Sequence, residues 1–166
     1  MGFRERWKEN KTFNKFKKTY FKNHKLDNYE INIGLCDEAL KELTDEHNIG
    51  FVLSYKCYSY LCLDKIEEFV KLSETVSEIE ASIMVSYYRL LVALENDIID
   101  FKEEYKRFVS LGRKMDTKGA FDMLKKEVDD IRRALKAKQK ITDKQVLGHL
   151  QRSKMPTMQR IYQKIK

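Results

Sequence analysis

The residue types that most often catalyse reactions or bind metals are few in this chain, and their spacing does not bring them together. The three histidines, His24, His47 and His149, are far apart in the sequence. None stands three or four residues from a cysteine or another histidine, the spacing that places two metal ligands on one helix face. The sequence also lacks Glu-x-x-His, a phosphate-binding glycine loop and Gly-x-Ser-x-Gly. It therefore predicts a protein that is not an enzyme and that needs no cofactor or metal.

The cysteines indicate a reducing environment. Cys36, Cys57 and Cys62 are odd in number and lie within apolar helical patterns, so we expect buried free thiols and no disulfide framework. Residues 1–25 lack the apolar segment of a signal peptide, and no stretch of about 18 apolar residues could cross a membrane. We therefore expect a cytoplasmic location.

Charge is sorted along the chain. Residues 1–25 carry nine Lys/Arg against Glu5 and Glu9, and residues 132–166 carry eleven against Asp143 alone. Residues 26–131 carry thirteen Lys/Arg against twenty-three Asp/Glu. Two basic ends around an acidic middle indicate either an anionic partner or ends that fold back on the middle.

The basic C-terminal segment resembles a helix-turn-helix. Residues 141–150 are similar to its first helix and residues 156–162 to its recognition helix, joined by a turn at 152–154. The resemblance implies a set of nucleic-acid or anion contacts: Arg152, Lys154, Gln159, Arg160 and Lys164. The alternative is a basic helical hairpin that docks on the acidic middle or lies in solvent.

The N-terminal segment, residues 3–22, alternates basic and aromatic side chains. Such a pattern suits an anionic membrane surface or RNA, and the candidate contacts are Arg4, Trp7, Lys11, Lys15 and Lys18. A structural role is the alternative, in which the aromatic stripe covers the open end of a helical stack while the lysines face water. The apolar stripe of this predicted helix is interrupted at residues 10–14.

The elements that must position these residues are helices. Six glycines and one proline provide too little turn chemistry for a β protein, so the predicted fold is all-α. Apolar spacing predicts helices over about 3–22, 28–46, 51–63, 64–76, 78–95, 97–112 and 118–139, then a short helix ending near 152 and a last one over 157–165. In the helix over 118–139, the apolar stripe includes Val128 and Ile131. Asn48-Ile49-Gly50 is expected to separate two of them, and Thr142–Gln145 to form a capping box.

An internal repeat appears at an offset of 32 residues, where similar residues pair: Leu53/Val85, Ser54/Ser86, Tyr55/Tyr87, Asp64/Asn96, Ile66/Ile98 and Phe69/Phe101. Over residues 28–112 the pattern resembles a degenerate tetratricopeptide-like stack of antiparallel helical hairpins. The resemblance implies a concave face that binds a peptide or protein. Its candidate groove residues are Tyr55, Tyr58, Tyr87 and Tyr88, although burial in the core is the alternative for these rings.

The expected organisation is a helical-repeat domain over 1–140, with its basic aromatic N-terminal helix, and a basic appendage over 141–166. The leading functional interpretation is a non-enzymatic protein that binds a protein or peptide. A nucleic-acid-binding regulator that uses the C-terminal segment is the alternative, and attachment to anionic membrane through residues 3–22 is the third.

Overall fold

The computed structural model describes residues 2–115 and 119–166, and every regular element in these ranges is an α-helix, which confirms the all-α class. The helices are α1 (Phe3–Lys25), α2 (Tyr29–Glu42), α3 (Glu46–Cys62), α4 (Ile66–Ser73), α5 (Ile79–Glu95), α6 (Phe101–Gly112), α7 (Gly119–Ala137), α8 (Lys144–Arg152) and α9 (Pro156–Ile165). No helix in the described ranges has the length and apolar character needed to span a bilayer. The chain divides into two compact units, Met1–Ala81 and Ser82–Lys166.

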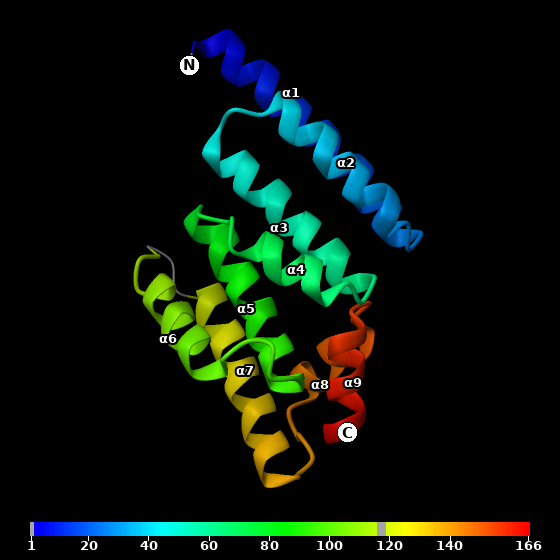
Figure 1. Ribbon diagram of the computed structural model, residues 1–166, viewed down its shortest axis with the longest axis vertical. Helices are drawn as coiled ribbons and strands as arrows, with labels where there is room; N and C mark the ends of the chain where they lie inside the picture. The colour runs from blue at the N-terminus through cyan, green and yellow to red at the C-terminus, as the bar shows by residue number, and fades with distance from the viewer. Residues whose placement is uncertain (1, 116–118) are drawn as a thin grey trace. The chain divides into compact units, whose positions relative to one another are not determined.

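In the first unit, α1 packs on α2, α2 on α3 and α3 on α4, and successive helices run in opposite directions (Figure 1). Each helix contributes one apolar stripe, because residues three or four apart share a face. The stripes of the first three helices meet in a core formed by Phe16, Tyr20, Cys36, Ala39, Leu43 and Val52.

Buried polar groups join the first three helices. The hydroxyl of Tyr20 lies 2.9 Å from the carbonyl oxygen of Tyr55 and 3.0 Å from the hydroxyl of Ser59. Asn32 is fully buried; its amide donates to the carbonyl of Tyr20 and accepts from Asn23, both at 3.1 Å. Because buried polar groups without partners destabilise a fold, this network specifies how α1 sits on its neighbours.

One expected interruption does not occur: residues 48–50, expected to separate two helices, lie inside α3. Helix α1 is continuous through residues 10–14, where its apolar stripe is interrupted in the sequence. Gly50 is buried, and a Cβ atom placed there would lie 2.5 Å from Cβ of Glu78. The glycine therefore permits close approach of the backbone to the residues that start α5, and the tertiary contact outweighs its low helix propensity.

Aspartate side chains start three helices and correct the expected boundaries. Asp45 accepts from Asn48 N at 3.1 Å, Asp100 from Glu103 N at 2.8 Å, and Asp143 from Gln145 N and Val146 N at 2.9 and 3.3 Å. Helix α6 therefore begins after Asp100, not near residue 97. Asp143, not Thr142, caps α8.

The second unit contains most of α5 and all of α6 to α9. Phe108 of α6 and Phe121 of α7 meet with ring centroids 4.8 Å apart. Val128 and Ile131, which the apolar spacing placed on the inner face of α7, are fully buried. The expected start of that helix at residue 118 lies outside the described residues.

The expected domain boundary after residue 140 lies inside the second unit. Helix α9 packs on α7 and α8. Ile141 N donates to the carbonyl of Ile165 at 3.0 Å, and Arg160 of α9 forms an ion pair with Glu95 of α5. Residues 141–166 are therefore packed into this unit.

Candidate anion-binding surface on helix α1

The outward face of α1 carries a row of cations. Its members follow one another at alternating steps of four and three residues, and all are exposed: Arg4, Lys8, Lys11, Lys15, Lys18, Lys22 and Lys25. Such steps keep side chains on one helix face, and at 1.5 Å per residue the row is about 32 Å long. Among the described residues, none of these seven side chains forms an ion pair. We call them the cationic row.

The opposite face of α1 is buried, and Glu9 anchors it. The Glu9 carboxylate accepts from Thr44 N at 3.0 Å, from the Thr44 hydroxyl at 2.8 Å and from Asp45 N at 2.5 Å. These donors lie just before α3, so the carboxylate satisfies free backbone groups at that helix start. Desolvation alone would raise the pKa of Glu9, but the hydrogen bonds from Asp45 and Thr44 outweigh it and hold this pKa below its ordinary value.

Trp7 is the only tryptophan of the chain and lies among the cations of α1. Its side chain is 62% exposed, and the Lys11 ammonium lies 5.4 Å from its ring centroid. Phe21 is also exposed, with its ring packed edge-on against Tyr20 and Tyr55. The outward side of α1 therefore combines positive charge with accessible aromatic surface.

The structure brings together all five residues that the sequence suggested for contact with RNA or membrane, namely Arg4, Trp7, Lys11, Lys15 and Lys18. The sequence interpretation did not include Lys8, Lys22 and Lys25 among its candidate contacts. Their alternating spacing of four and three residues was a signal that could have found them.

The first two candidate groove tyrosines pack against helices of their own unit. Tyr55 of α3 is half-buried, and its ring centroid lies 4.9 Å from that of Tyr20. Tyr58 is half-buried beside His24 and Tyr29, at 5.7 and 6.3 Å between centroids. Both rings therefore serve the packing of α3 on α1 and α2.

The other two tyrosines belong to α5, in the second unit. Tyr87 is buried and donates its hydroxyl to Glu127 of α7 at 2.7 Å. Tyr88 is half-buried, with its ring centroid 5.6 Å from that of Tyr87. Tyr87 therefore contributes to the interior of the second unit.

In the C-terminal segment, Gln159 and Arg160, both predicted nucleic-acid contacts, form intramolecular bonds. The Gln159 amide donates to the carbonyls of Leu150, Gln151 and Ser153, at 3.2, 3.1 and 2.6 Å, and so closes the end of α8. Arg160 is bound to the carboxylate of Glu95 through two of its nitrogens. These side chains hold α9 in place.

The remaining predicted contacts of this segment differ in exposure. Arg152 and Lys164 are exposed, whereas Lys154 is half-buried. They stand on α8, on the turn and near the end of α9. The structure thus gives the segment fewer available base-reading groups than a recognition helix presents.

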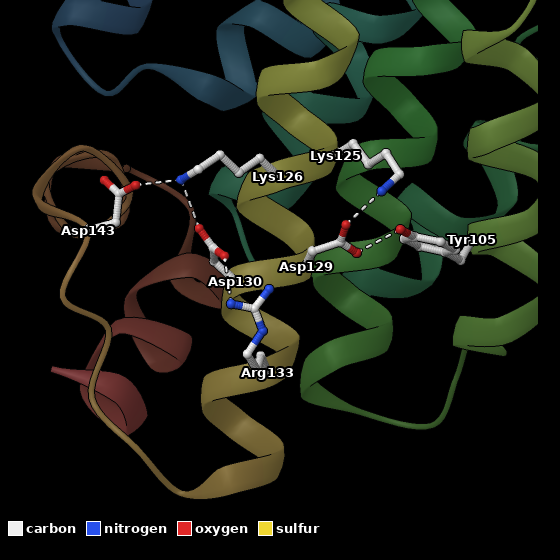
Figure 2. A network of polar contacts seen from close by, with 7 residues as sticks. All are labelled: Tyr105, Lys125, Lys126, Asp129, Asp130, Arg133 and Asp143. Carbon is white, nitrogen blue, oxygen red and sulfur yellow. Dashed lines mark hydrogen bonds and ion pairs between the residues drawn. The ribbon is translucent and has the colours of Figure 1, made fainter.

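Elsewhere in the second unit, charges of opposite sign neutralise one another. Lys126 lies 2.9 Å from Asp130 and 2.5 Å from Asp143, and this contact lowers the pKa of Asp143. The whole network contains Tyr105, Lys125, Lys126, Asp129, Asp130, Arg133 and Asp143 (Figure 2). In the ranges that the structure describes, no comparable ion-pair network involves the cationic row.

The side chains that could act as nucleophiles or metal ligands are buried or lie apart from one another. Cys36 and Cys57 are buried and Cys62 is half-buried, and burial raises the pKa of the Cys36 thiol, away from the reactive thiolate. In the part of the chain that the structure describes, no three His, Cys, Asp or Glu side chains are placed to hold a metal ion.

Comparisons with known proteins do not assign this chain to a family. No family model matches it, and no curated protein or solved structure gives a significant match. The tetratricopeptide-like and helix-turn-helix resemblances therefore rest on sequence pattern alone. What the structure supports is a set of mutually packed helices that is compatible with a helical repeat.

Proposed function

We propose that this protein acts by binding, not by catalysis, and that it holds a polyanionic partner along the cationic row. One observation carries the proposal: seven exposed cations share one face of α1, while the two acidic residues of this helix are engaged in hydrogen bonds. Glu9 accepts its bonds at the start of α3, and Glu5 accepts from Gly2 N at 2.8 Å. Like charges spaced in this way destabilise a helix, and an anionic partner removes that cost.

The order of the helices supports a scaffold role. Helix α5 begins 33 residues after α3, and α6 begins 35 residues after α4, close to the 32-residue offset seen in the sequence. We propose that residues 28–112 are a degenerate tetratricopeptide-like repeat and that α1 covers the apolar end of α2 and α3. A terminal element with a polar outer face is what such arrays need for solubility.

The partner is placed on an exposed helix face because the other candidate surfaces receive less support. The rings of Tyr55 and Tyr58 pack against neighbouring helices, which weakens the case for a peptide groove. Gln159 and Arg160 are engaged within the second unit, which weakens the case for base reading by α9.

The test compares two triple variants with the same change in net charge. The first is Lys11→Glu, Lys15→Glu and Lys18→Glu on α1; the control is Lys102→Glu, Lys136→Glu and Lys140→Glu, three exposed lysines of the second unit. Glutamate and lysine have similar helix propensities, so both variants should fold. The probe is fluorescein-labelled heparin, titrated by anisotropy across a series of salt concentrations.

We expect the wild type to bind with a steep loss of affinity as salt rises. The α1 variant should bind at least tenfold more weakly, and the control variant should lose less than threefold. Equal losses in the two variants, or no measurable binding by the wild type at low salt, would overturn the proposal.

A further inference from the structure

We infer that the polyanion is a single-stranded nucleic acid and that Trp7 provides the platform on which one of its bases stacks. The inference rests on the proposed function, because it identifies the ligand of the same cationic row. It adds a claim that charge alone does not make, namely that an aromatic ring takes part in recognition.

The position of Trp7 is the first reason. The ring is 62% exposed and lies beside the row, one residue before Lys8 and four before Lys11. Lys11 already lies over the ring, at 5.4 Å from the ammonium nitrogen to the centroid. Proteins that bind single strands combine a positive track for the backbone with aromatic side chains that accept bases, and both parts are present on α1.

The spacing of the row is the second reason. Its side chains stand three or four residues apart, which places neighbouring Cβ atoms about 5–6 Å from each other. An extended strand that lies along α1 can therefore bring successive phosphates to successive lysines. Lysine binds phosphate as a point charge without geometric selection, so the contact should be largely independent of sequence.

A duplex makes poorer use of this surface. Its phosphates would meet the lysines, but its bases are paired and stacked, so Trp7 would find no free base face. Duplex binding is thus expected to be electrostatic only, and weaker by the contribution of the stacked ring.

A lipid surface also fits less well. An interfacial helix inserts an apolar face into the membrane, and the apolar face of α1 is buried: Phe16 is 4% exposed and Tyr20 is 1% exposed. Among the residues of α1 whose burial the structure describes, Trp7 and Phe21 are the large apolar side chains that remain exposed.

The test uses the fluorescence of Trp7, which reports on this site alone because the chain has no other tryptophan. The full-length protein is titrated with an oligouridylate, with a duplex of matched length, with heparin, with polyglutamate and with vesicles that contain phosphatidylserine. Base stacking should quench the emission, so we expect quenching with the oligouridylate and little change with heparin or duplex. A shift of the emission to shorter wavelength with the vesicles, without quenching by the oligouridylate, would overturn the inference in favour of a membrane.

Variants provide the second arm, read by anisotropy of the labelled oligouridylate. Trp7→Ala should weaken binding about 5- to 100-fold, the range found when stacked aromatic rings are removed from single-strand sites. Trp7→Phe should restore part of the loss, and heparin binding should be unchanged in both variants. Equal oligouridylate affinity in wild type and Trp7→Ala, or polyglutamate binding as tight as oligouridylate binding, would overturn the inference.

The two proposals fail in distinguishable ways. If the α1 charge variant loses heparin binding but Trp7→Ala keeps oligouridylate binding, the cationic row stands as a polyanion site and only the nucleic-acid inference is overturned. If the α1 charge variant binds heparin as the wild type does, the proposed function itself is overturned, whatever Trp7 does.

Discussion

His149 of α8 lies with Nδ1 2.9 Å from each carboxylate oxygen of Glu127 on α7. The same carboxylate accepts the hydroxyl of the buried Tyr87 at 2.7 Å. One half-buried acid therefore joins α5, α7 and α8 in the second unit. The hydrogen bond to Glu127 raises the pKa of His149 above its ordinary value, against an opposing effect of desolvation.

The contact makes stability depend on pH. Because the folded-state pKa of His149 is raised, its stabilising effect is fully present below the ordinary value of about 6.5 and is lost as pH rises through the folded-state pKa. His149 is about half exposed, so the effect should stay below about 1 kcal/mol. We expect the melting temperature of the wild type to fall towards that of His149→Gln as pH rises from 6 to about 9. The comparison of the two proteins isolates the contribution of His149, and a constant gap between the two curves would contradict the prediction.

Glu9 should stabilise the first unit through the start of α3. Its carboxylate satisfies two backbone donors and one hydroxyl, and removing it leaves them without a protein partner. We expect Glu9→Ala to lower the free energy of unfolding by about 1–3 kcal/mol in urea denaturation. Glu5→Ala is the matched control, since Glu5 bonds only to Gly2 at the exposed helix start. Equal effects of the two substitutions would refute this role of Glu9.

Gln159 should behave as a structural residue of the C-terminal hairpin. Gln159→Ala removes a donor from three carbonyls at the end of α8, of which only that of Leu150 keeps the backbone N–H of Ser153, and we expect a loss of about 1–2 kcal/mol of stability by thermal or urea denaturation. Gln163→Ala, an exposed position on the same helix, should be close to neutral. Oligouridylate affinity should be the same in both variants. A selective loss of affinity in Gln159→Ala would instead support nucleic-acid reading by α9.

Two helical glycines should respond to alanine in opposite directions. At Gly50 the added Cβ would lie 2.5 Å from Cβ of Glu78, so Gly50→Ala should destabilise the protein by about 1–3 kcal/mol. At Gly34, in α2, nothing lies within 4 Å of the added atom, so Gly34→Ala should stabilise by about 0.5–1 kcal/mol through helix propensity. Urea denaturation of both variants measures the difference, and stabilisation by Gly50→Ala would show that the close approach is absent in solution.

Periodic apolar residues predicted most helices, because a buried stripe at the helical period needs no long-range information. Val128 and Ile131 of α7 lie at the expected inner positions for this reason. Local helix propensity gave a wrong helix boundary at a position where a tertiary contact determines the structure. Gly50 was expected to end a helix, but its contact with Glu78 keeps it inside α3.

The candidate site was partly predictable on the same grounds. The cations of α1 could be assigned to one face from spacing alone, because their positions depend only on helix geometry. The intramolecular bonds of Gln159 were not predicted because its acceptors lie six to nine residues away, across a turn whose path the sequence does not define. Glu9 was not singled out for a similar reason: its partners Thr44 and Asp45 are thirty-five residues or more away.

The anchoring of α1 by Glu9 and Tyr20 also bears on the thermodynamics of association. The cations belong to a helix that is already formed and is hydrogen-bonded to its neighbours. Binding of a ligand therefore need not be coupled to folding of the site. The entropy lost on binding should then come mainly from the ligand and from the lysine side chains. Among single strands of equal charge, a stiffer one should bind more tightly than a more flexible one, and the heat capacity change should be small.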